Sequence, residues 1–484
     1  MSLKLRALQG AVWNAVENVG SQLTSFVLFL VFARLISPDA IGVVQMAITL
    51  LGFLTIFVEH GFSAVIIRAP TLRPAMLNTA FWLGLGGGTT LAVALTLSAD
   101  AIALAYRSPE LAHVLRVLAW TVPLTTLSCV QTALLIRNLA FKTQALRRLV
   151  AVLGGGIVGV WLALLDYGVW SLVARLLVEA AIDCAIAWGY TDFRPGTSLS
   201  RSEARGFASF GSRIVGSYAV GFLNRRTDEL LIGFVLGPVA LGYYAVAARA
   251  MSLVTEVALR AAQRTAVPVL SKLQDEPERL RETYYTAVEL AAVVACPVFV
   301  GLSAVAPELC VTMFGAKWAP VVPAMQILGL AGVAMSIAIY TAPVLISVGK
   351  PSWLFQFTLA ETVINVAAAA IAVRFGIVAV AIAYVVRSYV ALPLVLAVTQ
   401  RALGTRSLRV LRLVFPPGFS SLLMFAVVAL VRGLLPSLPA AARLVLLVTA
   451  GGATYLGAMW LLGRRTMERV MSMLRLHREV RAAA

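Results

Sequence analysis

Seven arginines lie inside long apolar stretches of the 484-residue sequence. Each would cost about 2.5–3.5 kcal/mol at the middle of a bilayer, so most should face water, a carboxylate or an anionic ligand rather than lipid. A guanidinium stays charged and presents a planar fork of donors that fits phosphate oxygens. These residues therefore offer the chemistry of phosphate binding. They are Arg175, Arg213, Arg225, Arg226, Arg249, Arg260 and Arg387.

Five of the seven fall in the neighbouring apolar stretches 208–236 and 240–263. This asymmetry predicts that the two stretches form one wall of a water-filled cavity, in which the arginines bind a diphosphate. Arg249 falls near the middle of its stretch. At about 1.5 Å of helix rise per residue, this position predicts a depth near the middle of the membrane. The members of this predicted cavity wall are Arg213, Arg225, Arg226, Arg249 and Arg260.

Acidic neighbours leave a second interpretation open. Glu229 follows Arg225 by four residues, and Glu256 precedes Arg260 by four, so each pair shares a helical face. Ion pairs of this kind would serve helix packing alone. Arg175 lies on one face with Glu179 and Asp183, and for this set a self-neutralised ladder is the favoured interpretation.

The first apolar stretch carries a polar face that we expect to line the same cavity, or to hold helices together by hydrogen bonds. Separately, carboxylates within apolar stretches could bind a proton or a sodium ion, and pairing with arginine is the alternative. The polar lining is Asn14, Glu17, Asn18 and Gln22, and the candidate coupling carboxylates are Glu17, Glu256 and Glu361.

The composition excludes a water-soluble globular enzyme. Hydrophobic residues make up 60% of the chain and charged residues 13%, and the mean hydropathy is +0.89. The four cysteines and three histidines show no metal-ligand spacing, and the chain contains no phosphate loop of the GxxxxGK[ST] type. We therefore expect no catalytic residue, no metal, no cofactor and no direct use of ATP.

The apolar stretches predict an all-α polytopic membrane protein with about fourteen transmembrane helices. The net charge of +18 reflects topology rather than nucleic-acid binding, because 26 of the 40 Lys and Arg residues fall in loops on the side of the termini and seven fall opposite. Both termini are predicted to be cytoplasmic in a bacterial inner membrane, with no cleaved signal peptide. The spans are 8–33, 41–67, 76–99, 112–136, 148–165, 168–190, 208–236, 240–263, 284–304, 320–348, 352–373, 376–399, 412–432 and 441–462.

An internal repeat relates the two halves of the chain. Residues 33–42 align with 233–242, which places Pro38 over Pro238 and Gly42 over Gly242. A Tyr-Gly-Val turn at 167–169 likewise matches Phe-Gly-Ile at 375–377. The repeat predicts two pseudo-symmetric six-helix lobes plus two C-terminal helices. The expected domains are an N-lobe at 1–190, a cytoplasmic linker at 191–207, a C-lobe at 208–400, helices 13 and 14 at 401–463, and a basic cytoplasmic tail at 464–484.

Four segments together resemble the polysaccharide exporters of the multidrug/oligosaccharidyl-lipid/polysaccharide flippase superfamily. They are 32–42, His60-Gly61-Phe62, 77–82 and 136–142. The resemblance covers nearly the whole chain and is greatest to Wzx-like exporters of colanic acid and related lipopolysaccharide and exopolysaccharide precursors. It implies a flippase that moves a polyprenyl-diphosphate-linked oligosaccharide to the periplasmic leaflet by alternating access. The expected partners are that lipid-linked substrate, the bilayer, H+ or Na+, and polysaccharide polymerase machinery.

Three alternatives remain open. Flipping of a peptidoglycan lipid precursor needs the same diphosphate chemistry, and a drug or cation antiporter belongs to the same superfamily. An antiporter for cations would line its cavity with acids, which the arginines argue against. A membrane polymerase or glycosyltransferase would need a sizeable outer loop or an acid in the first outer loop, which here offers only Asp39.

Overall fold

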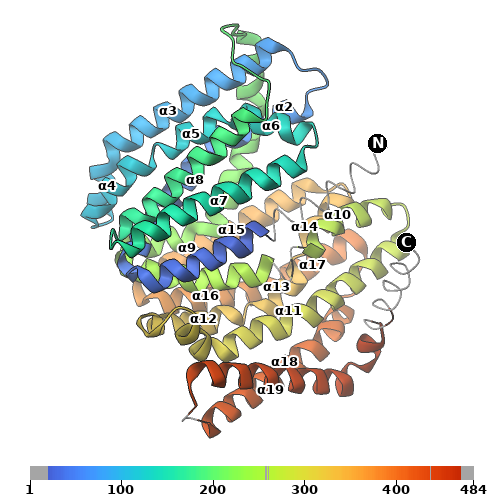
Figure 1. Cartoon of the computed structure of the whole chain (residues 1–484). Coiled ribbons are helices and arrows are strands. Elements are labelled where there is room, and N and C mark those ends of the chain that lie inside the picture. Colours follow the sequence, from blue (N-terminus) through green and yellow to red (C-terminus); the bar gives the residue numbers. More distant parts are fainter. Residues whose placement is uncertain (1–19, 257–258, 260, 436–437, 470–471, 473–484) are drawn as a thin grey trace. The chain divides into compact units, whose positions relative to one another are not determined.

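The computed structural model describes residues 20–256, 259, 261–435, 438–469 and 472. These residues form α-helices and short 3-10 helices with no strand among them, which confirms the predicted all-α class (Figure 1). Nine of the described helices are long and apolar enough to cross a membrane, or up to eleven if each of two bent pairs is one span. The protein is therefore a multi-pass membrane protein, and the number of fourteen crossings stays a prediction.

The chain divides into two compact units, Met1–Ala245 and Val246–Ala484. Proline occupies the first turn of many helices in both units, where its missing N–H is not needed for a helical hydrogen bond. The helices of the first unit are Gly20–Leu35, α2 Pro38–Arg68, α3 Pro74–Ala105, α4 Pro109–Leu118, α5 Thr121–Leu127, α6 Cys129–Arg137, α7 Phe141–Leu164, α8 Val169–Gly189 and the part of α9 (Arg201–Thr255) up to Ala245.

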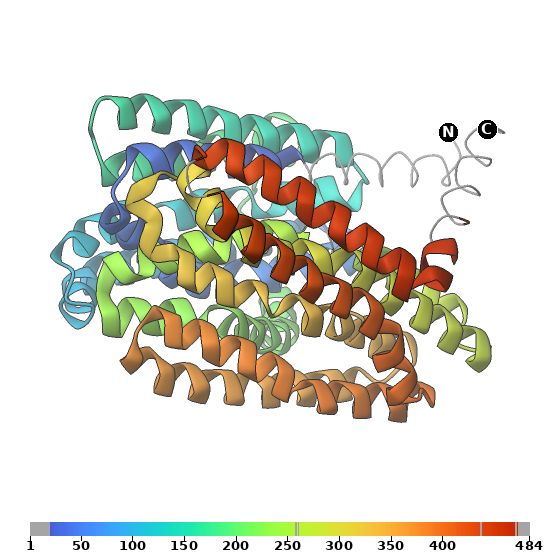
Figure 2. The same ribbon diagram turned by 90° about the horizontal axis from the view of Figure 1, so that it is seen from below.

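The second unit is built around α11, which packs against α12, α18 and α19. Figures 1 and 2 both show α18 and α19 side by side at the red end of the colour bar. Its elements after α9 are α10 Ala261–Lys272, α11 Pro277–Met313, η2 Ala316–Val321, α12 Val322–Gly329, α13 Gly332–Ala338, α14 Thr341–Ser347, α15 Pro351–Ala372, η3 Val373–Phe375, α16 Ile377–Val390, α17 Leu392–Leu403, α18 Ser407–Leu434 and α19 Ala440–Leu462.

The fourth helix of each predicted half is broken in the same way. The predicted span 112–136 is divided into α4, α5 and α6, and the predicted span 320–348 into α12, α13 and α14. Each series bends by 42° at one of its breaks. The bend lies between α5 and α6 in the first half and between α12 and α13 in the second, so the halves share a division into three short helices but not the position of the bend.

Backbone conformation repeats as well. Residues with positive φ occur at Arg107, Leu139 and Gly168 in the first half, and at Gly315, Gly349 and Gly376 in the second. The separations are 208, 210 and 208 residues, which reproduces the offset of the Tyr-Gly-Val and Phe-Gly-Ile turns.

The paired Pro/Gly turns of the repeat pack against each other inside the first unit. A Cβ on Gly42 would collide with the carbonyl oxygen of Pro238, and a Cβ on Gly242 would collide with that of Pro38. Because the contact is reciprocal, glycine is required on both sides. Gly237 has φ 83° and joins the predicted stretches 208–236 and 240–263 into the kinked helix α9. In the second stretch α9 ends at Thr255 and α10 begins at Ala261, and residues 257, 258 and 260 between them lie outside the described part of the chain.

Candidate functional site

The candidate site is centred on α9, where Arg225 and Arg226 precede the kink at Gly237 and Arg249 follows it. Arg225 and Arg226 are exposed and Arg249 is half-buried. Arg225 and Arg226 belong to the first compact unit and Arg249 to the second.

A buried carboxylate anchors Arg226. Glu229 is only 5% exposed, yet it forms an ion pair with Arg226 and lies within hydrogen-bond distance of two α2 side chains. The Gln45 amide donates to Glu229 Oε2 over 2.8 Å, and the Thr49 hydroxyl lies 2.9 Å from the same oxygen. These partners satisfy a charge that would otherwise be costly to bury.

The ion pair differs from the pair expected at a spacing of four residues. Glu229 pairs with Arg226, which lies three residues before it. Arg226 therefore has a local acidic partner, which sequence reasoning did not assign to it. One guanidinium nitrogen of Arg226 contacts the acid, and because the side chain is 46% exposed, other donors of the fork remain accessible.

Asp228, next to Glu229, forms a hydrogen bond across the kink of α9. Asp228 accepts a hydrogen bond of 2.5 Å from the hydroxyl of Tyr244, which lies beyond Gly237 and is 1% exposed. This bond joins the two segments of the helix and fixes the direction in which the segment bearing Arg226 leaves the kink. Sequence reasoning missed Gln45, Thr49 and Tyr244, because none of them stands in a spacing with the arginines.

Several predicted site residues lie outside the described part of the chain. These include Asn14, Glu17 and Asn18 of the polar lining, and Arg260 of the cavity wall. The backbone of Arg213 belongs to α9, but its side chain is not described. Gln22 and Glu256 are half-buried. The gathering of all five arginines around one cavity therefore stays a prediction.

The ladder predicted along α8 is paired differently. Asp183 forms an ion pair of 3.2 Å with Arg147, and Glu179 forms one of 3.2 Å with Arg148, both from α7. The guanidinium of Arg175 lies over the ring of Phe32 at 5.3 Å. Arg147 and Arg148 are therefore helix-packing residues as well as contributors to the positive charge of the loop side.

The candidate coupling carboxylate Glu361 of α15 lies 3.8 Å from Arg387 of α16. Arg387 also lies over the ring of Tyr384 at 5.2 Å. The pairing alternative considered for Glu361 is thus present in the structure. Within the described residues, no group of three or more His, Cys, Asp or Glu side chains could hold a metal ion.

Residues of the segment 77–82 form hydrogen bonds to the connection between α8 and α9. Asn78 of α3 donates to the Ser198 hydroxyl over 2.7 Å and accepts from the amide of Gly196 over 3.0 Å. The amide of Ser200 donates to the Thr79 hydroxyl over 2.9 Å. These bonds give a structural role to residues that the family resemblance had only marked.

Relatives with curated names are named for the biosynthesis of polysaccharides, and one of them for transport. The succinoglycan biosynthesis transport protein ExoT of Rhizobium meliloti (strain 1021) is 26% identical over 358 residues, covering 74% of this chain and 72% of ExoT. The lipopolysaccharide biosynthesis protein WzxC of Escherichia coli (strain K12) is 24% identical over 404 residues, covering 80% of this chain and 81% of WzxC.

Solved structures with the same fold are transporters. The lipid II flippase MurJ in its inward closed conformation superposes with a TM-score of 0.77 at 15% identity, over 94% of this chain and all of that structure. An inward-facing multidrug resistance MATE family transporter of the MOP superfamily gives 0.63 at 16% identity, over 80% of this chain and 98% of that structure.

The family described as polysaccharide biosynthesis protein matches residues 31–323, which is more than half of the chain. This match includes all of α2 to α8, the whole of α9 with its arginines, and all of α10, α11 and η2. The chain is therefore a membrane-embedded member of the polysaccharide biosynthesis protein family, with the fold of MurJ and sequence similarity to ExoT and WzxC.

Proposed function

We propose that the protein is a flippase that moves a polyprenyl-diphosphate-linked oligosaccharide from the cytoplasmic to the periplasmic leaflet for polysaccharide export. The proposal combines the family, the fold of a lipid flippase and an arginine-bearing helix. In this account Arg226 and Arg249 bind the diphosphate, Arg213, Arg225 and Arg260 assist them, and Asn14, Glu17, Asn18 and Gln22 line the cavity.

The observation that carries the proposal is the anchored guanidinium of Arg226. The buried Glu229 holds one of its nitrogens, and the side chain stays 46% exposed. A cation held in this way loses little conformational entropy on binding an anion, because its geometry is already set. A side chain that served packing alone would instead be enclosed on all sides.

The proposal also concerns the membrane, the coupling ion and the polysaccharide polymerase machinery. The charge bias of the loops favours a bacterial inner membrane with cytoplasmic termini. We expect transport to be coupled to protons or sodium ions through Glu17, Glu256 or Glu361. We also expect the protein to contact polysaccharide polymerase machinery. We expect no catalytic step and no nucleic-acid partner.

The test is the replacement by alanine of Arg226 and Arg249, the two arginines proposed to bind the diphosphate. Arg226→Ala and Arg249→Ala should each lower polysaccharide export at least about tenfold, because a hydrogen bond to a charged group contributes about 1.5–3 kcal/mol. Export is measured as surface polysaccharide per cell, and abundance by immunoblot of membranes. Arg205→Ala is the matched control, because Arg205 is an exposed arginine in the first turns of the same helix.

Arg226→Lys separates charge from geometry. Lysine keeps the charge but loses the planar fork, so we expect export between those of wild type and Arg226→Ala. Normal export by both alanine variants and by the double variant would refute the cavity role of these arginines.

A second candidate is the flipping of a peptidoglycan lipid precursor, which the fold match with the lipid II flippase MurJ favours. Deletion of the gene distinguishes the two. Loss of surface polysaccharide in viable cells supports polysaccharide export, whereas lysis on depletion supports the peptidoglycan precursor.

A further inference from the structure

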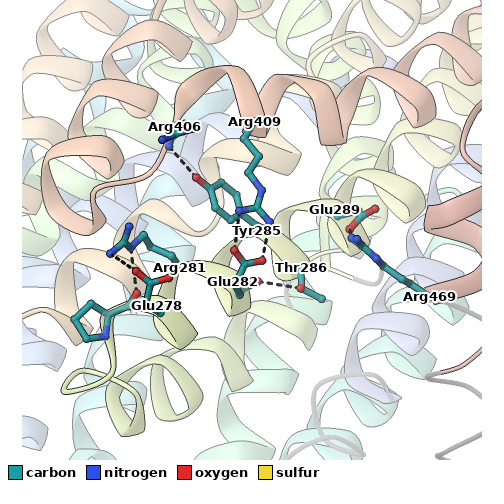
Figure 3. A network of polar contacts seen from close by, with 10 residues as sticks. Glu278, Arg281, Glu282, Tyr285, Thr286, Glu289, Arg406, Arg409 and Arg469 are labelled. Atoms are coloured by element: carbon teal, nitrogen blue, oxygen red, sulfur yellow. Dashed lines mark hydrogen bonds and ion pairs between the residues drawn. The ribbon is translucent and has the colours of Figure 1, made fainter.

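Acidic residues along α11 hold the hairpin of α18 and α19 and the segment after it. Near the start of α11, the Glu282 carboxylate accepts two bonds of 2.7 Å from Arg409 of α18 (Figure 3). Further along, Glu289 accepts from Arg469 over 3.0 Å and from the Thr466 hydroxyl over 2.5 Å. At each of these contacts one carboxylate is matched by one guanidinium.

The opposite end of α11 is charged differently. Glu308 is 2% exposed and accepts from Arg432 of α18, through Nε over 2.9 Å and through Nη2 over 3.0 Å. The Nε of Arg443 of α19 also lies within ion-pair distance of Glu308, at 3.3 Å. Two guanidinium charges thus share one carboxylate, which leaves a surplus charge of +1 at this end of the hairpin.

The second arginine keeps donors available. Within the described part of the chain, the two terminal nitrogens of Arg443 make no hydrogen bond to another residue. The side chains of Arg432 and Arg443 are 27% and 25% exposed, so solvent or a ligand reaches both. Their positions on adjacent helix ends and their common acid fix them as a pair.

The surroundings of the pair indicate what kind of anion it would meet. Leu430, Leu434 and Val445 lie on the same helix ends and are exposed, as expected of lipid-facing side chains. Arg432 and Arg443 lie in the last turn of α18 and the first turn of α19, at the depth where a membrane span ends. The charge bias of the loops puts this end at the outer leaflet. The phosphate of a membrane lipid lies at this depth, so an anionic lipid is the anion that this position favours.

We propose that Arg432 and Arg443 bind the phosphate of an anionic lipid in the outer leaflet, with Glu308 positioning both guanidinium groups. The site uses none of the residues assigned to the diphosphate cavity and goes beyond the proposed function. Two sources share this chemistry, an anionic glycerophospholipid and a polyprenyl phosphate, and the experiment separates them.

The test is native mass spectrometry of the full-length protein in detergent with added phosphatidylglycerol, and with phosphatidylcholine of the same acyl chains. Arg443→Gln should reduce the preference for phosphatidylglycerol about fivefold, which corresponds to about 1 kcal/mol for one basic residue near an anionic lipid surface. Arg374→Gln should leave it unchanged, because Arg374 is an exposed arginine of the same unit and of the same predicted side.

Glu308→Gln makes the test independent of packing. Glutamine keeps a side-chain oxygen that can accept from the guanidinium groups, but it removes the negative charge, so phosphatidylglycerol binding should be retained or strengthened in the folded fraction. Equal loss in Arg443→Gln and Glu308→Gln would show a packing contact only and would overturn the proposal, as would wild-type binding in Arg443→Gln.

Competition with undecaprenyl phosphate identifies the source. Displacement of bound phosphatidylglycerol at equal concentration assigns the site to a polyprenyl phosphate, and retention assigns it to a bulk phospholipid. Failure of lipid binding here would leave the export phenotypes of Arg226 and Arg249 variants unaffected, so the two proposals fail separately.

Discussion

Gly315 closes a tight turn with a backbone conformation that other residues adopt only with strain. Its φ is 100° and its ψ is 165°, a region that only glycine occupies without strain, and no atom lies within 4 Å of where a Cβ would stand. Gly315→Ala should therefore lower the free energy of unfolding by about 1–3 kcal/mol through backbone strain alone. The measurement is denaturation in detergent micelles.

Gly87→Ala is the matched control for this substitution. Gly87 also has open space around its Cβ position, but it lies in the interior of α3 with helical backbone angles. Alanine should there raise the free energy of unfolding by about 0.5–1 kcal/mol. If both variants shift in the same direction, backbone strain is not what Gly315 relieves.

The surroundings of Glu229 show where residue-level inference from the sequence ends. A spacing of four residues left a pair with Arg225 open as the alternative interpretation, since such residues share a helical face. The structure pairs Glu229 with Arg226 because its oxygens also meet Gln45 and Thr49 of α2. Spacing within one helix carries information about that helix alone, whereas the partners of a buried acid are chosen by tertiary packing.

The broken fourth helices belong to the scale of elements, and side-chain hydroxyls that bond to the backbone occur along both of them. The hydroxyls of Thr121, Thr126 and Ser128 each bond the carbonyl three residues earlier in the first half, over 2.6–3.0 Å. Ser336 and Ser347 do the same in the second half, over 2.7 and 2.8 Å. Such bonds compete with the helical ladder and bend it.

Hydropathy alone predicted each of these regions as one continuous span. Hydropathy identified the apolar content of each region correctly, because a region crosses a similar apolar thickness whether its helix is straight or broken. The hydroxyl and proline positions within the span hold the information about the break. Pro123 in the first half and Pro323 and Pro343 in the second fall in the short helices themselves.

The fastening of the connection between α8 and α9 yields a test at the same scale. Asn78→Ala removes two hydrogen bonds to this connection, each worth about 1 kcal/mol. Tryptic cleavage after Arg201, the first residue of α9, should therefore become at least about tenfold faster in inverted membrane vesicles. Gel densitometry of the cleavage products gives the rate.

Thr90→Ala serves as the control in that experiment. Thr90 lies on the same helix, but its hydroxyl bonds only the carbonyl of Gly86 in its own helix. An Asn78→Ala cleavage rate equal to that of Thr90→Ala would mean that the connection is held by other contacts.

For the whole molecule, the sequence indicated the duplication, because turns are local features that survive divergence, and the even distribution of fourteen spans stays a prediction. The limits of the compact units were not accessible in the same way. The first unit extends to Ala245 and therefore includes the first segment of α9, whose turn packs on α2. Which helices associate depends on complementary surfaces, such as glycine against carbonyl, that no single turn reveals.

The reciprocal turn contact gives a prediction for the whole fold. Gly42→Ala and Gly242→Ala each place a methyl group against a backbone carbonyl, which cannot rotate away. Each should lower the free energy of unfolding by about 1–3 kcal/mol or more, as overpacking does. The amount of folded protein in membranes, measured by fluorescence-detected size exclusion, should fall in both, and to a similar extent.

Unequal effects of the two substitutions would contradict the reciprocity of the contact. A normal folded amount in both would contradict the contact itself. Gly87→Ala again supplies the comparison, since it adds the same methyl group where no atom lies within 4 Å.

The contact between Pro38–Gly42 and Pro238–Gly242 has a consequence for the history of the chain. Each turn presents the same glycine and the same proline carbonyl to the other, which is the geometry of an isologous interface between two identical subunits. A half-length ancestor with one such turn could have made this contact with a second copy of itself. Fusion of the two genes would then have kept a dimer interface as an internal joint of one polypeptide.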